Sequence, residues 1–310
     1  MIKLSHLLMI RITLTVGAPF YLQDNNERST LVGGVEVTPH SLPYQVGLII
    51  DDRKFCGGVL ISSKYVLTAA HCVSYCSGVQ VILGAHNINY VEDTQIISLN
   101  PTVIVHQNYS GSYENDIALL KLSTYVQLTH EIEPIFELAD DDCGDFLGAT
   151  ALLSGWGYTY HGGALKEKLR KVSLNVMSNT ICSFTFAALD VTVAESHLCT
   201  CGNDSITGRI GACFGDSGGP LVVGRTLIGL VSFGDEICEA GNPTVFTRIS
   251  HFREWIYSLI PPSGCHHPAI CRVWMLFHFR RHLSLLLKIP NEVSSLGEGV
   301  IGDVTGVCKS

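Results

Sequence analysis

A serine set among glycines is the feature that most constrains what this chain can fold into and do. Residues 215–220 read Gly-Asp-Ser-Gly-Gly-Pro, which favours a tight turn because glycine adopts backbone conformations that other residues avoid. Such a turn leaves the hydroxyl of Ser217 free to react. A serine hydroxyl is a weak nucleophile at neutral pH, so a catalytic interpretation requires a base and an orienting carboxylate elsewhere in the chain.

Two further blocks supply these groups. Leu67-Thr68-Ala69-Ala70-His71-Cys72 contains a histidine, and Asn115-Asp116-Ile117-Ala118-Leu119-Leu120 contains a carboxylate within an apolar run. Taken singly, the histidine, the aspartate and the glycine-rich turn each have an ordinary structural explanation. Together, in the order His, Asp, Ser, the three blocks resemble those of the chymotrypsin/trypsin-like serine endopeptidases.

The resemblance extends over residues 31–260 and implies an all-β fold of two six-stranded antiparallel β-barrels with a C-terminal helix. Local patterns agree with this. Short β-rich runs occupy 79–83, 103–105, 117–122, 172–176 and 227–231. Near the end, Ser250 is the predicted N-cap of a helix whose apolar face carries Phe252, Trp255, Ile256 and Leu259.

The resemblance also implies the role of each site residue. Ser217 attacks the scissile carbonyl, His71 acts first as general base and then as general acid, and Asp116 orients the imidazole. The backbone N–H groups of Gly215 and Ser217 form the oxyanion hole. Ser232 lies where the family aligns the substrate backbone.

Three positions correspond to the primary specificity pocket. Gly211 stands where trypsins carry an aspartate, Gly234 leaves the entrance open, and the branched Thr244 makes the pocket shallower. Because a cation buried without a partner loses its hydration, the sequence predicts a preference for Leu, Met or Phe over Arg as the residue before the scissile bond.

Activation departs from the family pattern. Family members are cut after Arg or Lys, and the freed α-ammonium pairs with the aspartate beside the catalytic serine, here Asp216. In this chain Leu31 replaces the usual isoleucine and follows Thr30, while the nearest basic residue is Arg28. We therefore expect either direct cleavage after Thr30 or a trypsin-like cut followed by dipeptide trimming.

The chain has twelve cysteines, which favours an oxidising, secreted setting. The resemblance implies the disulfides Cys56–Cys72, Cys213–Cys238 and Cys182–Cys199, with Cys201 competing for the last pair. Unassigned cysteines are Cys76, Cys143, Cys201, Cys265, Cys271 and Cys308. The group formed by Cys265, His266, His267 and Cys271 lacks a second ligand pair at zinc-finger spacing, so no metal and no cofactor are predicted.

The segments outside residues 31–260 and the charge of the central region add further constraints. Residues 1–18 are a candidate signal peptide or a partial start, 19–30 an activation propeptide, and 261–310 an extension that is either an interfacial segment, a cleaved tail or a translated intron. Residues 31–260 contain 12 Lys and Arg against 23 Asp and Glu, which argues against nucleic-acid binding. A monomer acting on proteins or peptides, and open to protein inhibitors, is expected.

Three segments are similar to arthropod digestive enzymes, the insect chymotrypsin-like and crustacean brachyurin-type proteases. These segments are Val32-Gly33-Gly34-Val35-Glu36, Gly84-Ala85-His86-Asn87-Ile88 and Cys238-Glu239-Ala240-Gly241-Asn242-Pro243. The resemblance implies secretion, with the gut lumen as the expected destination. Two alternatives stay open: a regulatory protease of an immune or clotting cascade, and a catalytically silent binding homologue.

Overall fold

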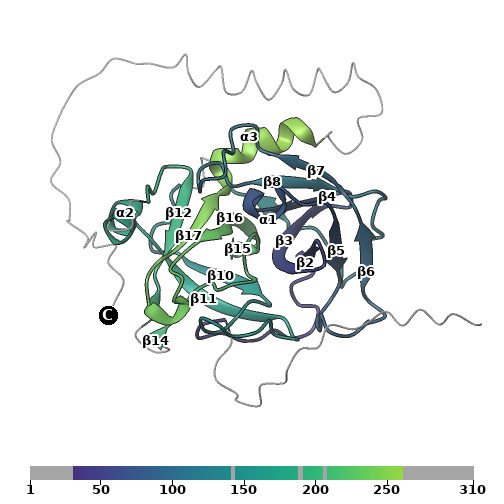
Figure 1. Cartoon of the computed structure of the whole chain (residues 1–310), viewed down its shortest axis with the longest axis horizontal. Coiled ribbons are helices and arrows are strands. Elements are labelled where there is room, and N and C mark those ends of the chain that lie inside the picture. Colours follow the sequence, from purple (N-terminus) through teal and green to yellow (C-terminus); the bar gives the residue numbers. More distant parts are fainter. Residues whose placement is uncertain (1–30, 141–143, 188–190, 205–207, 261–310) are drawn as a thin grey trace, which may run out of the picture.

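The computed structural model describes residues 31–140, 144–187, 191–204 and 208–260. Two β-sheets stand side by side in it, the first from the purple-to-blue part of the chain and the second from the teal-to-green part (Figure 1). Apart from one short parallel pairing, the neighbouring strands in both sheets run antiparallel.

The first barrel is a sheet of seven strands in the order β6-β5-β2-β3-β4-β8-β7. Its strands are β2 (Gln45–Ile50), β3 (Lys54–Ser62), β4 (Tyr65–Thr68), β5 (Val79–Leu83), β6 (Ile96–Leu99), β7 (Thr102–Val105) and β8 (Ala118–Lys121). The edge strands β6 and β7 are separated only by Asn100 and Pro101. The chain itself therefore joins the two edges, and β6 with β7 acts as one bent strand of a six-stranded barrel.

The second sheet closes through hydrogen bonds. Its strands are β1 (Val35–Glu36), β9 (Glu137–Leu138), β10 (Thr150–Gly155), β11 (Arg170–Met177), β12 (His197–Thr200), β15 (Pro220–Val223), β16 (Thr226–Phe233) and β17 (Thr244–Arg248). Six of them follow the order β11-β10-β15-β16-β17-β12, and β12 pairs back to β11. β1 and β9 add to this barrel from outside, and a separate small pair joins β13 (Asn203–Asp204) to β14 (Gly208–Arg209).

Within the described residues the helical elements are few, as the sequence predicts for an all-β fold. They are α1 (Ala70–Val73), α2 (Asn179–Ala187), the 3-10 turn η2 (Cys238–Ala240) and α3 (Ile249–Leu259). Phe252 and Ile256 of α3 are buried, as the helical pattern predicts. The N-cap prediction for Ser250 is wrong, because α3 follows directly from β17 and Arg248 stands at the cap position without a side-chain cap. Helix α2 is not among the predicted elements.

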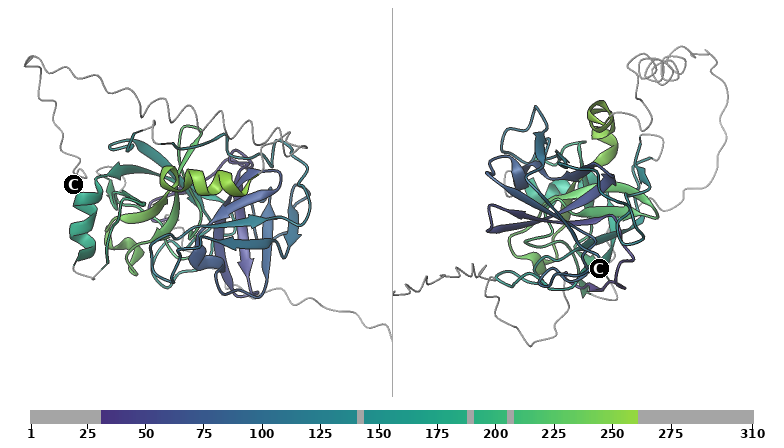
Figure 2. Two further views of the ribbon diagram at one scale, coloured as in Figure 1. Left: turned by 90° about the horizontal axis from the view of Figure 1, so that it is seen from above. Right: turned by 90° about the vertical axis from the view of Figure 1, so that its right-hand side faces the viewer.

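One apolar cluster joins both barrels to α3. It contains Val59, Leu67 and Leu119 from the first barrel, Leu227 and Leu230 from the second, and Ile249, Phe252 and Ile256 from the helix. Figure 2 shows α3 lying along the junction of the barrels. Burial of these side chains fixes the two barrels against each other, so that loops from both meet along one seam.

The structure contains the three disulfides that the resemblance implies: Cys56–Cys72, Cys182–Cys199 and Cys213–Cys238. Cys201 is also disulfide-bonded, so it does not compete for Cys182, and Cys76 is the free cysteine among the described residues. The signal, propeptide and tail predictions, with Cys143, Cys265, Cys271 and Cys308, lie outside those residues. Across the described ranges, every helix is too short or too polar to cross a membrane.

Candidate active site

His71 and Asp116 form a paired unit on the first barrel. His71 lies in α1, directly after β4, and Asp116 precedes β8, which pairs with β4. The Asp116 carboxylate accepts the backbone N–H of His71 at 2.8 Å and the ring Nδ1–H of the same residue at 2.8 Å. This double contact fixes the imidazole with its proton on Nδ1, which leaves the lone pair of Nε2 free to accept a proton.

The second barrel supplies further support for Asp116. The Ser232 hydroxyl donates to the carboxylate at 2.6 Å, and the Thr247 hydroxyl donates to the Asp116 carbonyl at 2.7 Å. The side chain of Asp116 is fully buried, so the Ser232 hydroxyl, with the two N–H groups of His71, replaces the hydration that an ionised carboxylate loses on burial.

Ser217 lies on the turn before β15 and is brought beside His71 by the first barrel. Its carbonyl accepts the Gly57 N–H at 2.7 Å. The Cys72 sulfur lies 3.7 Å both from this carbonyl and from His71 Nε2. Within the part of the chain that the structure describes, no hydrogen bond joins the Ser217 hydroxyl to His71. Such contacts often tighten only when substrate binds.

The turn around Ser217 contains backbone amides that no other group of the described residues uses. Gly215 has φ +96°, in the region that favours glycine. Among the described residues, the amides of Gly215 and Ser217 donate to no other protein group, whereas the intervening Asp216 amide donates to the Cys213 carbonyl. Two free N–H groups beside a serine can stabilise a developing oxyanion.

The residues predicted for the primary pocket gather at β16, β17 and the segment before Ser217. A Cβ atom added to Gly211 would lie 3.0 Å from the Thr244 hydroxyl, so these two predicted pocket residues are neighbours. A Cβ atom on Gly234 would find its nearest neighbour, the Pro243 carbonyl, only at 3.8 Å. Thr244 thus brings an uncharged side chain against Gly211, and the space beside Gly234 is less crowded.

Asp216 is a second fully buried carboxylate, next to Ser217. It accepts the Gly157 N–H at 2.9 Å and the Cys213 N–H at 3.0 Å. Burial raises its pKa to about 7, although these two hydrogen bonds act in the opposite direction. Leu31 is also buried, and Val32 after it bridges to Gly211. Val32 therefore connects Leu31, the predicted activation residue, to Gly211, a predicted pocket residue.

Three contacts to this site are not predicted from the sequence. Lys54 donates from Nζ to the His71 carbonyl at 2.9 Å, and the hydroxyls of Thr247 and Ser232 reach Asp116. The Lys54 contact has a signal in the sequence, because the implied Cys56–Cys72 disulfide brings residues 54 and 71 together. The hydroxyl contacts cross between the barrels and have no counterpart in the local sequence.

One cluster within the described residues has ligand atoms close enough for a metal ion: Cys56, His71 and Cys72. Both sulfurs are bonded to each other in a disulfide, so they offer no thiolate to a metal. His71 is held by Asp116 instead.

Comparisons with known proteins agree with this arrangement. The family model described as Trypsin matches residues 31–256. Brachyurin from Leptuca pugilator is 41% identical over 229 residues, which cover 73% of this chain and 96% of the relative. Chymotrypsin from Phaedon cochleariae is 36% identical over 231 residues, covering 73% and 80%. Trypsin II-P29 from Gallus gallus is 35% identical over 247 residues, covering 79% and 95%.

Proposed function

The chain belongs to the trypsin family and is a serine-type endopeptidase; from this premise we propose that His71, Asp116 and Ser217 are its catalytic triad, that it prefers apolar residues before the scissile bond, and that it is a secreted digestive enzyme. The observation that carries the triad is the double contact of Asp116 with His71, at 2.8 Å to the backbone N–H and 2.8 Å to Nδ1. It leaves Nε2 as the only ring nitrogen able to take the serine proton.

Peptide hydrolysis at this site proceeds by acylation and then deacylation of Ser217. The Ser217 oxygen bonds to the scissile carbonyl carbon while its proton passes to His71 Nε2, and the resulting oxyanion accepts hydrogen bonds from the amides of Gly215 and Ser217. Collapse of the intermediate breaks the C–N bond, and the proton on Nε2 goes to the leaving amine. A water molecule, deprotonated by His71, then releases the acid and restores the serine.

Substitution of the reacting groups tests the triad. Ser217→Ala or His71→Ala should lower kcat by several orders of magnitude, because the triad acts as a unit and only the oxyanion hole and binding remain. Peptide binding and the unfolding transition should be nearly unchanged. A kcat in Ser217→Ala that equals the parent value would refute the assignment. Titration of the active enzyme with an organophosphate separates a protease from a silent binding homologue.

The pocket supports an apolar preference, since the Thr244 hydroxyl lies over Gly211 and neither brings a charge to the floor. With peptides that differ only in the residue before the scissile bond, we expect kcat/KM for Leu, Met or Phe to exceed that for Arg by about 100-fold. Trp should be cleaved poorly, because Thr244 limits the depth. The matched variant Gly211→Asp should shift the preference toward Arg. Equal cleavage of Arg and Leu by the parent enzyme would overturn this pocket assignment.

Activation should free the α-amino group of Leu31. Leu31 is buried, and its neighbour Val32 bridges to Gly211, close in sequence to the turn that carries Asp216, which supports a pairing of the new ammonium with Asp216. A chain that begins at Ser29 would carry its charge two residues too far away. N-terminal sequencing of active enzyme decides the point: Leu31 is the expected first residue, and an active form that begins at Ser29 would contradict the pairing.

The digestive role rests on similarity to brachyurin and the beetle chymotrypsin, and the disulfides support an extracellular location. We place the signal peptide at 1–18, the propeptide at 19–30 and the protease domain at 31–260. A regulatory protease cuts one or a few protein substrates. Broad cleavage of a random peptide library after apolar residues would therefore support digestion, and cleavage restricted to one extended motif would support the regulatory alternative.

A further inference from the structure

A buried histidine outside the triad connects the second barrel to the segment that carries Asp116. His197 begins β12 and is 1% exposed. Its Nδ1 lies 2.9 Å from the Ala194 backbone N, and its Nε2 lies 3.0 Å from the Tyr113 carbonyl oxygen. A backbone N–H can only donate and a carbonyl can only accept, so the ring is neutral, with its proton on Nε2.

The residue held by this bond forms part of the surface beside the site. The Tyr113 ring lies against the Phe233 ring, with centroids 4.2 Å apart, and His197 meets the same Phe233 ring edge to face at 5.5 Å. Phe233 follows Ser232 on β16, along the strand that we expect to align the substrate backbone. Tyr113 is 46% exposed, so its ring can contact substrate residues that precede the one in the primary pocket.

Tyr113 and Asp116 are anchored to the second barrel by different groups. Asp116 is held by Ser232 and Thr247, whereas the Tyr113 carbonyl is held by His197. His197 and Thr247 are cross-strand partners in the β12–β17 ladder. Their adjacent side chains therefore hydrogen-bond to the two ends of segment 113–116. Loss of the His197 contact should therefore displace Tyr113 and leave Asp116 in place.

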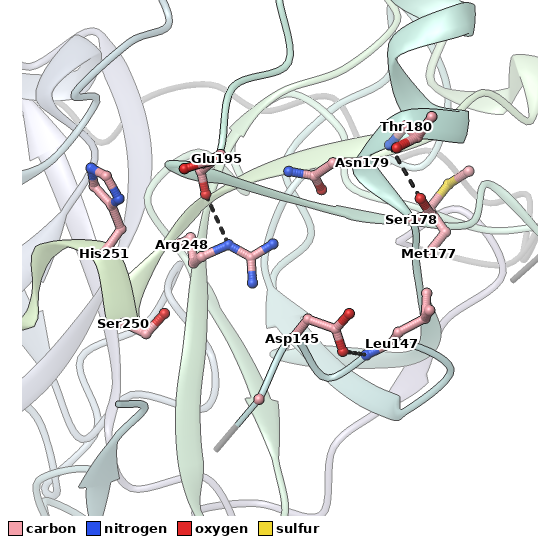
Figure 3. Close-up of a pocket in the computed structure, with 11 residues that line it drawn as sticks. Asp145, Leu147, Met177, Ser178, Asn179, Thr180, Glu195, Arg248, Ser250 and His251 are labelled. Carbon is pink, nitrogen blue, oxygen red and sulfur yellow. Dashed lines mark hydrogen bonds between the residues drawn. The ribbon is translucent and has the colours of Figure 1, made fainter. Parts of the chain in front are cut away.

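The turn that presents His197 is itself secured from the far side. Asn179 donates to the carbonyls of Ala194 and His197, and Arg248 donates from Nε to those of Glu195 and His197. Figure 3 shows Arg248 and Glu195 joined at this turn, with Asn179 beside them. The position of the imidazole is thus set by β17 and α2 as well as by its own strand.

From this geometry we propose that His197 is a positioning residue for substrate binding: its neutral form fixes the wall formed by Tyr113 and Phe233, and protonation releases that wall. A proton on Nδ1 would point at the Ala194 N–H, whose nitrogen lies 2.9 Å away and cannot accept it. The two N–H groups repel each other, so the cationic ring must shift, and its Nε2–H then moves away from the Tyr113 carbonyl. This inference rests on the proposed function, because it concerns substrates cut at Ser217.

The surroundings of His197 shift its pKa in opposite directions. The charged and titratable groups that act on it are Glu114 and Asp116 on the Tyr113 segment and His251 on α3; Glu195 lies on its own turn, and Arg248 of β17 binds the carbonyls of Glu195 and His197. Burial lowers the pKa of His197, while Glu114, Asp116 and the bond to Tyr113 partly offset the decrease. The neutral anchor is therefore present at neutral pH and is lost as the pH falls through the folded-state pKa, below the unperturbed value of about 6.5.

The test compares two substrates of the activated enzyme. One is a tetrapeptide amide that reaches Tyr113, and the other is a single-residue amide that fills only the primary pocket. Both need His71 as base, so the ratio of their kcat/KM values cancels the titration of His71. In the parent enzyme the ratio of tetrapeptide to short substrate should fall as the pH is lowered below the unperturbed histidine pKa of about 6.5. His197→Leu should raise KM for the tetrapeptide about threefold to tenfold, with kcat and the short substrate unchanged.

Two variants serve as controls. His197→Gln keeps an N–H donor for Tyr113 but does not titrate, so it should match the parent ratio at about pH 8 and hold it at about pH 5.5; this readout stands even if His197→Leu fails to fold. His251→Gln should keep the pH dependence. A pH-independent ratio in the parent, or a parent-like ratio in His197→Leu, would overturn the proposal. If neither substrate is cleaved by the parent enzyme, the proposed function fails instead.

Discussion

The two buried aspartates of this protein have different surroundings. Asp116 accepts three hydrogen bonds, from the His71 backbone, the His71 ring and the Ser232 hydroxyl. Asp216, with no exposed surface, accepts two, both from backbone amides. In the uncut chain the Asp116 carboxylate therefore already has its hydrogen-bond donors, whereas Asp216 lacks a positively charged partner among the described residues.

Each difference has a functional consequence. The donors of Asp116 come from both barrels, so the carboxylate that orients His71 is fixed as soon as the barrels meet. Asp216 instead lies where a Cβ atom on Gly155 or Gly157 would overlap its carboxylate, so the protein packs tightly against it from that side. We therefore expect activation to supply the missing charge at Asp216 and to leave Asp116 unchanged.

The largest expected effect comes from neutralising Asp116. In Asp116→Asn the amide can donate where the carboxylate only accepts, so His71 should turn to the tautomer with its proton on Nε2, which cannot act as base. The same change in the chymotrypsin triad lowers kcat about 10⁴-fold, and a loss of this size is expected here. Steady-state kinetics of the cleaved variant measure it, with circular dichroism as the control for folding. A loss below about tenfold would show that Asp116 does not set the tautomer.

The next effect is a pH dependence of the free energy of unfolding of the uncut chain. The folded pKa of Asp216, about 7, lies above the unfolded value of about 3.9. The stability associated with its protonated form is therefore present below about pH 4 and is lost as the pH rises toward 7, by up to about 4 kcal/mol. Urea unfolding of uncut Ser217→Ala protein between about pH 4 and pH 8 should detect the decrease.

Two comparisons isolate this effect from other titrating groups. Adding Asp216→Asn should abolish the decrease, and cleavage before Leu31 should also abolish it, because the new ammonium pairs with the ionised carboxylate. If the uncut protein and its Asp216→Asn variant differ by the same free energy of unfolding at every pH, burial does not raise the pKa of Asp216 as the structure indicates.

The sequence predicts the parts of this arrangement that depend on local pattern. The run at 79–83 coincides with β5; on the predicted apolar face of α3, Phe252 and Ile256 are buried, whereas Trp255 and Leu259 are partly buried. Helix α2 escapes prediction because Thr, Cys, Ser and Phe are weak helix formers and its apolar periodicity is poor; the Cys182–Cys199 disulfide and the contact with β12 hold it instead. The cap prediction at Ser250 fails because α3 begins without a connecting loop after β17.

In the site, too, local motifs can be predicted from the sequence and long-range contacts cannot. The blocks around His71, Asp116 and Ser217 are recognisable in the sequence because each is a contiguous motif. The third donor to Asp116 is Ser232, which lies 116 positions away on the other barrel, and the bond from His197 to Tyr113 spans 84 positions. Contacts at such separations depend on how the two barrels meet, which the shared core under α3 decides and no local pattern records.

The smallest effect tests whether the third donor matters. Ser232→Ala removes the 2.6 Å bond to the carboxylate and leaves both bonds from His71 in place. Since a hydrogen bond to a charged group contributes about 1.5 kcal/mol or more, kcat should fall about tenfold. KM should change little, because the backbone of residue 232, which we expect to align the substrate, is retained.

Thr247→Val is the matched control: it deletes a hydroxyl that donates to the Asp116 carbonyl, so it should lower the free energy of unfolding and change kcat by less than about threefold. Full kcat in Ser232→Ala would mean that His71 alone fixes the carboxylate, and the contrast between three donors at Asp116 and two at Asp216 would then have no catalytic meaning.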